Sequence, residues 1–238
     1  MTDLEDLERE IVACRACPRL VRWREEAAAN PPARFAGQTY WARPLPGFGD
    51  PDARVMILGL APAAHGGNRT GRIFTGDRSG DFLFASLHRT GFANQATSVS
   101  RDDGLELRGA WVTAVNRCAP PGNKPTPQER DTCLPFLVRE LEALDSARVV
   151  VALGAFAWSG ALRALEMAGH PVSRPRPRFG HGVEAAVGPF TLLGCFHPSQ
   201  QNTFTGTLTE PMIDAVFEHA RELAFGQEAP SGGPSGGR

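Results

Sequence analysis

The sequence lacks the segments that would carry it into or across a membrane. It has no apolar run of about 20 residues, the length that a transmembrane helix needs. It also lacks the positively charged and then apolar start that is typical of a secretory signal. No linker interrupts residues 1–225, whereas residues 226–238 are rich in Gly, Pro and Ser and are expected to be disordered. We therefore expect a single cytoplasmic domain over residues 1–225.

The sequence has almost no lysine, and the common phosphate-binding motifs are missing from it altogether. Lys124 is the only lysine among 25 Lys and Arg residues. Arginine suits phosphate recognition, although a GC-rich genome produces the same bias. Neither GxGxxG nor GxxxxGKS/T follows the first apolar run, which disfavours an enzyme that holds nucleotide phosphates on a glycine-rich loop. The net charge of −1 identifies no partner by itself.

Apolar runs alternate with segments of helical periodicity along the chain. This alternation predicts an α/β protein, a three-layer α/β/α fold with a central, mainly parallel four-stranded sheet. Thr126-Pro-Gln-Glu129 is a capping box, so a helix is expected to begin there. We predict a first helix that ends near Pro18 or Leu20, followed by an irregular but ordered segment up to Asp50. The predicted strands are 54–58, 111–115, 148–153 and 190–196, and the later helices are 79–90, 126–144, 155–168 and 208–223.

A polar, glycine-rich segment from Gly59 to Gly80 follows the first predicted strand, and Phe74 is its only aromatic residue. A loop of this length forgoes buried area and costs backbone entropy, so it is usually functional. In an open α/β sheet, ligands bind at the carboxyl ends of the strands. We expect the loops after all four strands to open on that edge and to form one active crevice.

Four of the five cysteines have a spacing that favours a metal site. Cys14 and Cys17 form a CxxC pair, whereas Cys118 and Cys133 flank a turn and a helix start. Disulfides are unlikely in a large chain without a secretory signal, and a redox CxxC usually follows a strand. Zinc and an iron–sulfur cluster both suit four thiols, and four unrelated buried cysteines are the alternative. Cys195 is expected to belong to the core.

Five motifs, in order over residues 4–225, together resemble the uracil-DNA glycosylase superfamily. The similarity is greatest to its family 5, the iron–sulfur type. The resemblance implies a parallel α/β fold with the active site at the strand ends. It also implies a 4Fe–4S cluster on Cys14, Cys17, Cys118 and Cys133. The motifs are Cys14-x2-Cys17, GLAPA from Gly59, Phe74-Thr-Gly-Asp77, Cys118-Ala-Pro-Pro-Gly-Asn-Lys-Pro, and His197-Pro-Ser-Gln-Gln-Asn202.

The implied reaction is hydrolysis of the N-glycosidic bond of uracil in DNA, which leaves an abasic site. Such enzymes first take the nucleotide out of the base stack into a pocket. By resemblance, Asp77 aids the attack of water or stabilises the oxocarbenium-like sugar. His197 approaches the pyrimidine O2 and stabilises charge on the departing base, and Asn123 bonds the base or positions water. The structural alternatives are a helix cap for Asp77, a hydrogen-bonded surface histidine for His197 and a turn residue for Asn123.

Further residues are expected at the substrate. Phe74 resembles the side chain that stacks on the flipped base, although it could also anchor the loop to the core. Asn202 lies in the segment that resembles the one entering the duplex beside the lesion. Ala61 and Ala63 stand in GLAPA, where the members most specific for uracil carry an acidic residue. The absence of that acidic residue here implies a wider range of base substrates, such as hypoxanthine and oxidised or etheno bases.

Lys124 is the residue that bears on whether such an enzyme would also cut the DNA strand. A glycosylase with lyase activity needs an amine for a Schiff base, and a lysine beside Asn123 more simply contacts phosphate. We therefore predict a monofunctional hydrolase, acting as a monomer on DNA with damaged bases and without a membrane partner. Two groups of arginines form either a phosphate track or a solvated face: Arg69, Arg72 and Arg78, and Arg174, Arg176 and Arg178.

Three rival functions stay open at this point. The strongest is a non-catalytic iron–sulfur protein that binds DNA damage and captures a flipped base, because GLAPA carries no acid to activate water. A nucleotide or sugar-phosphate enzyme is disfavoured by the missing phosphate motifs. An electron-transfer protein is disfavoured because nothing else in the chain suggests a redox partner.

Overall fold

The computed structural model describes residues 3–226 and contains a six-stranded sheet in the order β1-β3-β2-β4-β6-β5. The four central strands are parallel, as predicted, and β1 and β5 pair antiparallel with the two edges. The edge strands were not predicted, because β1 has two residues and β5 is largely exposed rather than apolar. The strands are β1 (Phe48–Gly49), β2 (Val55–Gly59), β3 (Ala110–Ala114), β4 (Val149–Leu153), β5 (Glu184–Val187) and β6 (Phe190–Cys195).

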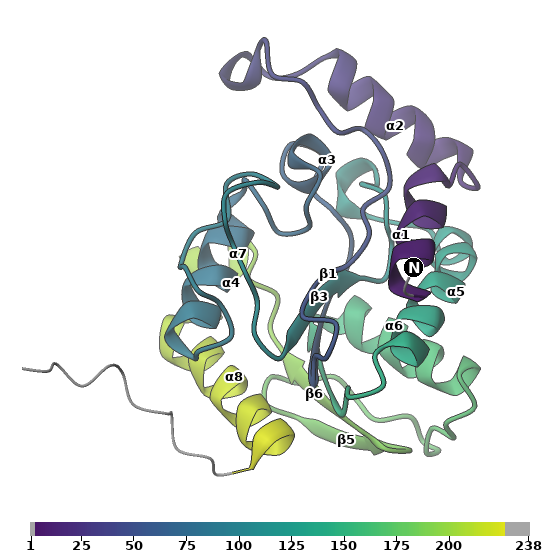
Figure 1. The fold of residues 1–238 in the computed structure, drawn as a ribbon, viewed down its shortest axis with the longest axis vertical. Helices are drawn as coiled ribbons and strands as arrows, with labels where there is room; N and C mark the ends of the chain where they lie inside the picture. Colours follow the sequence, from purple (N-terminus) through teal and green to yellow (C-terminus); the bar gives the residue numbers. More distant parts are fainter. Residues whose placement is uncertain (1–2, 227–238) are drawn as a thin grey trace, which may run out of the picture.

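Helices cover both faces of the sheet, which confirms the three-layer α/β/α architecture. In Figure 1, α4 and α8 lie on one side, and α5 and α6 lie on the other. The helix α1 packs against α5 on that second side. The helical elements are α1 (Asp3–Ala13), α2 (Pro18–Ala29), η1 (Ala33–Phe35), α3 (Gly67–Thr70), α4 (Arg78–Arg89), η2 (Pro121–Asn123), α5 (Pro127–Ala143), α6 (Ala155–Met167), α7 (Gln200–Phe204) and α8 (Glu210–Phe225).

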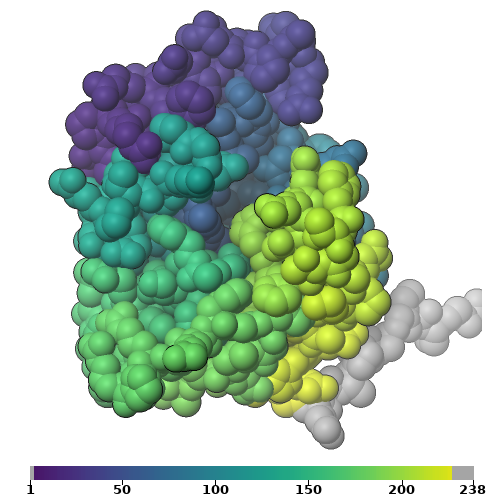
Figure 2. Space-filling view, turned by 180° about the vertical axis from the view of Figure 1, so that it is seen from behind, coloured from purple at the N-terminus to yellow at the C-terminus, as the bar shows by residue number. Residues whose placement is uncertain are grey.

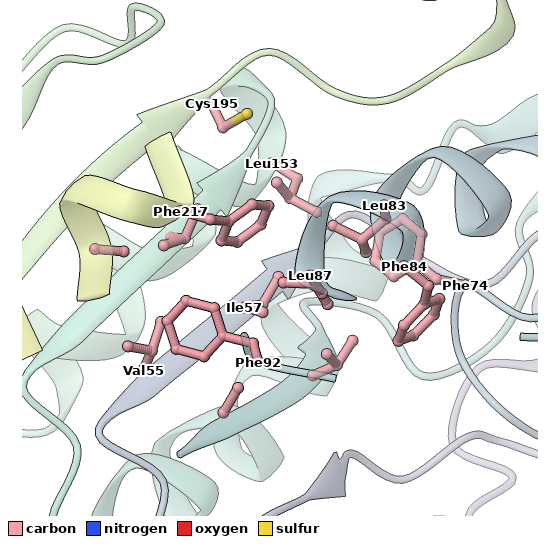
Figure 3. Close-up of a cluster of buried hydrophobic side chains, with 14 of the residues drawn as sticks. Val55, Ile57, Phe74, Leu83, Phe84, Leu87, Phe92, Leu153, Cys195 and Phe217 are labelled. Carbon is pink, nitrogen blue, oxygen red and sulfur yellow. The ribbon is translucent and has the colours of Figure 1, made fainter. Parts of the chain in front are cut away.

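Strand β2 shows how the sheet divides the core. Its residues are all buried, and successive side chains point to opposite faces. Val55 and Ile57 pack toward α4 and α8, in the cluster drawn in Figure 3. Met56 and Leu58 pack toward α5 and α6. Cys195 is fully buried in the first cluster, so its predicted core position is confirmed.

The amino-terminal prediction was wrong in one respect. The first helix ends at Ala13, and Pro18 begins a second helix, α2, instead of an irregular segment. Proline is tolerated at the first helical position, because its missing N–H would have no partner there. The buried positions Leu20, Val21, Arg24 and Ala27 then give α2 one inward face. As a result, the CxxC pair lies in the non-helical joint between two helices.

The other helix predictions agree with the structure to within about two residues at each end. The capping box of α5 is complete, because the Thr126 and Glu129 side chains each bond the other's backbone N–H. Within residues 3–226, no helix is both long and apolar enough to cross a membrane. The tail from residue 227 onward lies outside the described residues, so its predicted disorder stays a prediction.

Candidate functional site

A cleft lies at the edge where the parallel strands end. It is lined by residues from α2 and η1, the Gly59–Gly80 segment, η2 and the start of α7. Figure 2 shows this side of the molecule hollowed between the purple N-terminal part and the yellow-green part near residue 200. The crevice predicted at the carboxyl edge is thus present, but of the segments after the four parallel strands only those after β2, β3 and β6 contribute to its lining, because α6 begins directly after β4 and leaves no loop there. Its lining includes Trp23, Arg34, Phe35, Ala63, His65, Gly66, Arg69, Asp77, Arg78, Asp81, Asn123 and Gln200.

Asp77 is both a helix cap and a wall of the cleft. It is the N-cap of α4, and its Oδ1 accepts a hydrogen bond from Gly80 N at 3.0 Å. Its Oδ2 faces Gly66 so closely that a Cβ on Gly66 would lie 2.0 Å from it. Burial raises the pKa of Asp77, although the Gly80 and Ser79 amides oppose the shift. The helix cap therefore uses only one oxygen of this carboxylate, Oδ1, and the other oxygen, Oδ2, faces the cleft wall at Gly66.

Phe74 and His197 form a second group behind the cleft lining. Their ring centroids lie 6.1 Å apart. Phe74 is 7% exposed and joins the core cluster, on the side of Leu83 and Phe84 in Figure 3. Burial lowers the pKa of His197 to about 4, so its imidazole is neutral at pH 7. The ring of Phe74 lies 2.7 Å from where a Cβ on Gly59 would stand, so only glycine fits beside it.

Two of the candidate residues have a left-handed backbone. Phe74 has φ of 52° and Asn123 has φ of 56°. Such conformations cost about 1–3 kcal/mol and gather where a site requires them. Asn123 tolerates this region better than Phe74, since asparagine is enriched there. The strain at Phe74 indicates that its ring position, rather than local backbone preference, determines this turn.

The remaining candidates contribute unequally. Ala63 lines the cleft, whereas Ala61 is partly exposed and stands outside the lining. Asn202 donates its side-chain N–H to the His197 carbonyl at 2.9 Å, so it fixes the turn that carries this histidine. Asn123 is exposed at the rim. The structure thus brings Ala63, Asp77 and Asn123 to one cleft.

Sequence reasoning missed the roof of the cleft. Trp23 lies on α2, and its Nε1 is buried without a hydrogen-bond partner within the described chain. Arg69 donates to the carbonyls of His65 and Gly76, and its guanidinium lies 4.2 Å from the centre of the Phe35 ring. No signal pointed to Trp23 or Phe35, because neither α2 nor the short helix η1 was predicted. Arg69 and His65 stood inside the segment already singled out.

Of the six arginines predicted to form either a phosphate track or a solvated face, Arg72 fits neither description. Arg72 is 6% exposed and forms an ion pair with Asp103 at 2.8 Å. Arg174 and Arg176 both pair with Glu166. The Arg72 guanidinium is therefore held within the protein, whereas the ion pairs of Arg174 and Arg176 lie at the surface, as in a solvated face. Arg78 stays exposed at the cleft, and its guanidinium lies 5.0 Å from the ring centre of Phe204, which is 69% exposed.

The four candidate metal ligands meet around one small cavity, here called the cysteine cavity. Cys14 and Cys17 come from the joint between α1 and α2, Cys118 from the loop after β3, and Cys133 from α5. All are free thiols. Burial raises the pKa of Cys118 to about 11 and that of Cys133 to about 12. Across residues 3–226, no three His, Cys, Asp or Glu side chains are grouped as ligands of a single metal ion.

Two N–H donors face sulfurs of this cavity. Arg24 Nη1 lies 3.0 Å from Cys118 Sγ, and the Arg117 backbone N lies 3.3 Å from Cys133 Sγ. Donors to sulfur suit thiolates better than thiols, because a thiolate accepts more strongly. Four thiols around one cavity with such donors fit a polynuclear cluster, which spreads its ligands more widely than one ion does.

An α/β sheet with a polar cleft at its carboxyl edge defines a class of ligand-binding α/β proteins. Within this class, the family model of the "Uracil DNA glycosylase superfamily" matches residues 46–221. The chain belongs to this superfamily and, within it, to family 5.

Curated relatives agree over nearly the whole chain. It is 56% identical to the "Type-5 uracil-DNA glycosylase" of Mycobacterium bovis, over 92% of this chain and 81% of that one. The protein with the same title in Thermus thermophilus is 48% identical over 93% and 99%. The "Type-4 uracil-DNA glycosylase" of Archaeoglobus fulgidus is 27% identical over 84% and 83%. The recognition drawn from the five motifs is thereby confirmed.

Proposed function

We propose that this protein is a uracil-DNA glycosylase, which hydrolyses the N-glycosidic bond of uracil in DNA by base flipping and water attack and leaves an abasic site. The observation that carries the proposal is Asp77, a carboxylate at the cleft with one oxygen committed to a helix cap. The titles of the type-5 relatives support the same activity. The rival damage-binding protein would need no such carboxylate.

Asp77 acts on the sugar side of the bond. Its Oδ2 is turned toward the glycine of the cleft wall, where it can polarise a water or stabilise positive charge on the sugar. The helix cap holds the carboxylate in one orientation, so less entropy is lost when the substrate arrives. Its raised pKa makes it a stronger base than an ordinary aspartate.

His197 acts on the base side of the bond. A neutral imidazole can donate an N–H to the uracil O2 and stabilise the negative charge that develops there. Its lowered pKa keeps it neutral during turnover. Asn202 positions this residue through the His197 carbonyl. Phe74 lies close enough to share the base with His197, in a stacking role that requires the buried ring to be reached from the cleft.

The rim residues serve recognition. Asn123 bonds the flipped base or positions water, and Ala63 leaves space at the cleft where other members of the superfamily carry an acid. Ala61 is a weaker candidate for a substrate contact, since it lies outside the cleft lining. Without an acid in GLAPA, we propose that the enzyme also removes hypoxanthine and other deaminated or damaged bases. Release of hypoxanthine from a duplex tests this extension.

The cysteine cavity would hold a 4Fe–4S cluster on Cys14, Cys17, Cys118 and Cys133. Bound there, the cluster would crosslink the α1–α2 joint to the β3–α5 segment and so stabilise the α2 roof of the cleft. The residues present fit this role, because all four thiols line one cavity and two of their sulfurs receive N–H donors.

Lyase activity is not expected. Lys124 is exposed and follows Asn123 in the chain but is not part of the cleft lining, so it is better suited to a phosphate contact than to attack on the sugar. Borohydride trapping on uracil-containing DNA should therefore give no covalent adduct. An adduct that disappears in Lys124→Ala would contradict this proposal.

The duplex is expected to meet the rim formed by Arg78 and Phe204. An exposed aromatic ring under a guanidinium offers both a stacking surface and a phosphate contact. Replacing Phe204 with Ala should weaken binding to a uracil-containing duplex and leave the melting temperature unchanged. Unchanged affinity would place the duplex elsewhere.

The decisive experiment is release of free uracil from a duplex with one U·G pair, with substrate in excess. Wild type should turn over many times, whereas Asp77→Ala and His197→Ala should not. Asp81→Ala and His88→Ala are matched controls, because Asp81 is another acid of the cleft and His88 is an exposed histidine on α4. Binding without release by wild type would support the damage-binding alternative.

A further inference from the structure

Two buried arginines flank the cysteine cavity, and their surroundings differ. Arg117 is 2% exposed and has a carboxylate partner: its Nη1 lies 3.0 Å from Glu140 Oε1, and its Nη2 bonds Glu140 Oε2. Thr113 bonds the same guanidinium. This charge is therefore compensated within the protein, as a buried charge requires.

Arg24 is equally buried but has no such partner. It is 2% exposed, and its Nη1 lies 3.0 Å from Cys118 Sγ. Its Nη2 makes a long contact of 3.4 Å with the Cys14 carbonyl, and its Nε, like that of Arg117, is buried without a hydrogen-bond partner. Among the ion pairs of residues 3–226, none joins Arg24 to a carboxylate; the exposed Glu25 pairs with Arg15, which lowers the pKa of Glu25, and the charge of Arg24 adds to this lowering. A buried cation without a counter-charge costs several kcal/mol.

The missing counter-charge is supplied if the cysteines carry a cluster. A neutral thiol gives Arg24 only a weak acceptor and no charge. Four thiolates around an iron–sulfur core form an anionic assembly, and Cys118 Sγ would then be a charged acceptor at hydrogen-bond distance. The potential of such a cluster depends on net charge, hydrogen bonds to sulfur and exposure. Arg24 alters the first two of these at the same atom.

We propose that Arg24 is the positioning residue that neutralises a thiolate-bound cluster through Cys118, and that it thereby sets the cluster's reduction potential and retention. The inference rests on the proposed cluster. It predicts that the positive charge of Arg24, rather than the shape of its side chain, stabilises a cluster bound in the cysteine cavity.

The test compares Arg24→Gln and Arg24→Lys with wild type, each purified under anaerobic conditions. Arg22→Gln is the matched control, because Arg22 is an exposed residue of the same helix. The readouts are iron and sulfide per chain, the reduction potential and the rate of cluster bleaching by chelator and oxygen. None of them depends on glycosylase activity.

Arg24→Gln should shift the potential to a more negative value, because removing a nearby cation disfavours uptake of an electron. It should also lose the cluster several-fold faster than wild type. Arg24→Lys keeps the charge but lacks the planar guanidinium, so its potential and its rate of cluster loss should lie between those of wild type and Arg24→Gln. Arg22→Gln should match wild type in both. If Arg24→Gln retains too little cluster for a potential, the contrast between its iron content and that of Arg24→Lys is the measure.

Three outcomes would overturn the proposal, and they are distinguishable. Wild-type potential and lifetime in Arg24→Gln, or identical behaviour of the Gln and Lys variants, would show that the charge of Arg24 is not needed while the cluster stands. Wild-type protein without iron would refute the cluster and this inference with it, whereas uracil release could still confirm the glycosylase.

Discussion

The cysteine cavity and the cleft lie on either side of α2 and are built in opposite ways. The cavity gathers four thiols among apolar side chains such as Leu20 and Phe136. The cleft is open and polar, with two carboxylates, three arginines and a histidine in its lining. One suits a group that stays, and the other suits a substrate that enters and leaves. The helix α2 contributes to both regions, since its Arg24 contacts Cys118 of the cavity and its Trp23 lines the cleft.

The largest expected effect comes from breaking the cavity. Cys17→Ala should lose iron and lower the yield of soluble protein, because a cluster site contributes folding energy directly. Cys195→Ala is the matched control, since this cysteine is fully buried in the core but lies outside the cavity. The control should keep its iron and lose about 1 kcal/mol of unfolding free energy. A soluble Cys17→Ala protein with full iron and activity would show that the cavity does not need this ligand.

The next effect separates chemistry from folding in the cleft. Asp77→Asn keeps an N-cap of similar strength, because asparagine caps helices as well as aspartate does. It should nevertheless lower single-turnover uracil release by about 10²–10⁴-fold, the usual contribution of a positioned acid or base. Melting temperatures of Asp77→Asn and Asp81→Asn should both stay near wild type. Loss of activity in Asp81→Asn as well would mean that negative charge in the cleft matters more than this one carboxylate.

The two regions also differ in how much the sequence could predict. The cysteines were found because ligand identity and spacing carry the signal, whatever the fold around them. Asp77 and Asn123 were found through the motif order, and the strand ends followed from apolar runs. Trp23 and Phe35 were not found, because an aromatic residue on a helix face gives no sign of whether it covers a core or a cleft. Arg24 was invisible for a different reason: its burial depends on the fold, and surface arginines are far more common.

A smaller effect should appear where the two regions are joined. Asn68 of α3 is fully buried and donates to the Arg24 carbonyl at 3.1 Å and to the Ala64 carbonyl at 3.3 Å. It therefore ties α2 to the wall of the cleft. Asn68→Ala leaves both carbonyls without this donor and should cost about 1–3 kcal/mol of unfolding free energy. Urea unfolding measures this loss, and a stability equal to wild type would show that water replaces the amide.

The smallest expected effect is on the pH dependence. Burial lowers the pKa of His197 to about 4, whereas the hydrogen bond to Glu184 raises the pKa of the half-buried His219 above 6.5. Uracil release should therefore show no inflection from His197 near pH 6.5. It should fall only at lower pH, as Asp77 is protonated at a pKa above 3.8.

The same shift has a signed consequence for stability. Between pH 6.5 and about 4, the unfolded chain protonates His197 while the native state does not. The native state then binds fewer protons, so this contribution to stability is complete above pH 6.5 and is lost as the pH falls through that window. Titration of the histidine ring signals by NMR measures the pKa of His197, on which the predicted pH dependence of uracil release and that of stability both depend. A His197 resonance that titrates near pH 6.5 would show that burial does not lower the pKa of this imidazole, and an inflection of uracil release near that pH would then be expected.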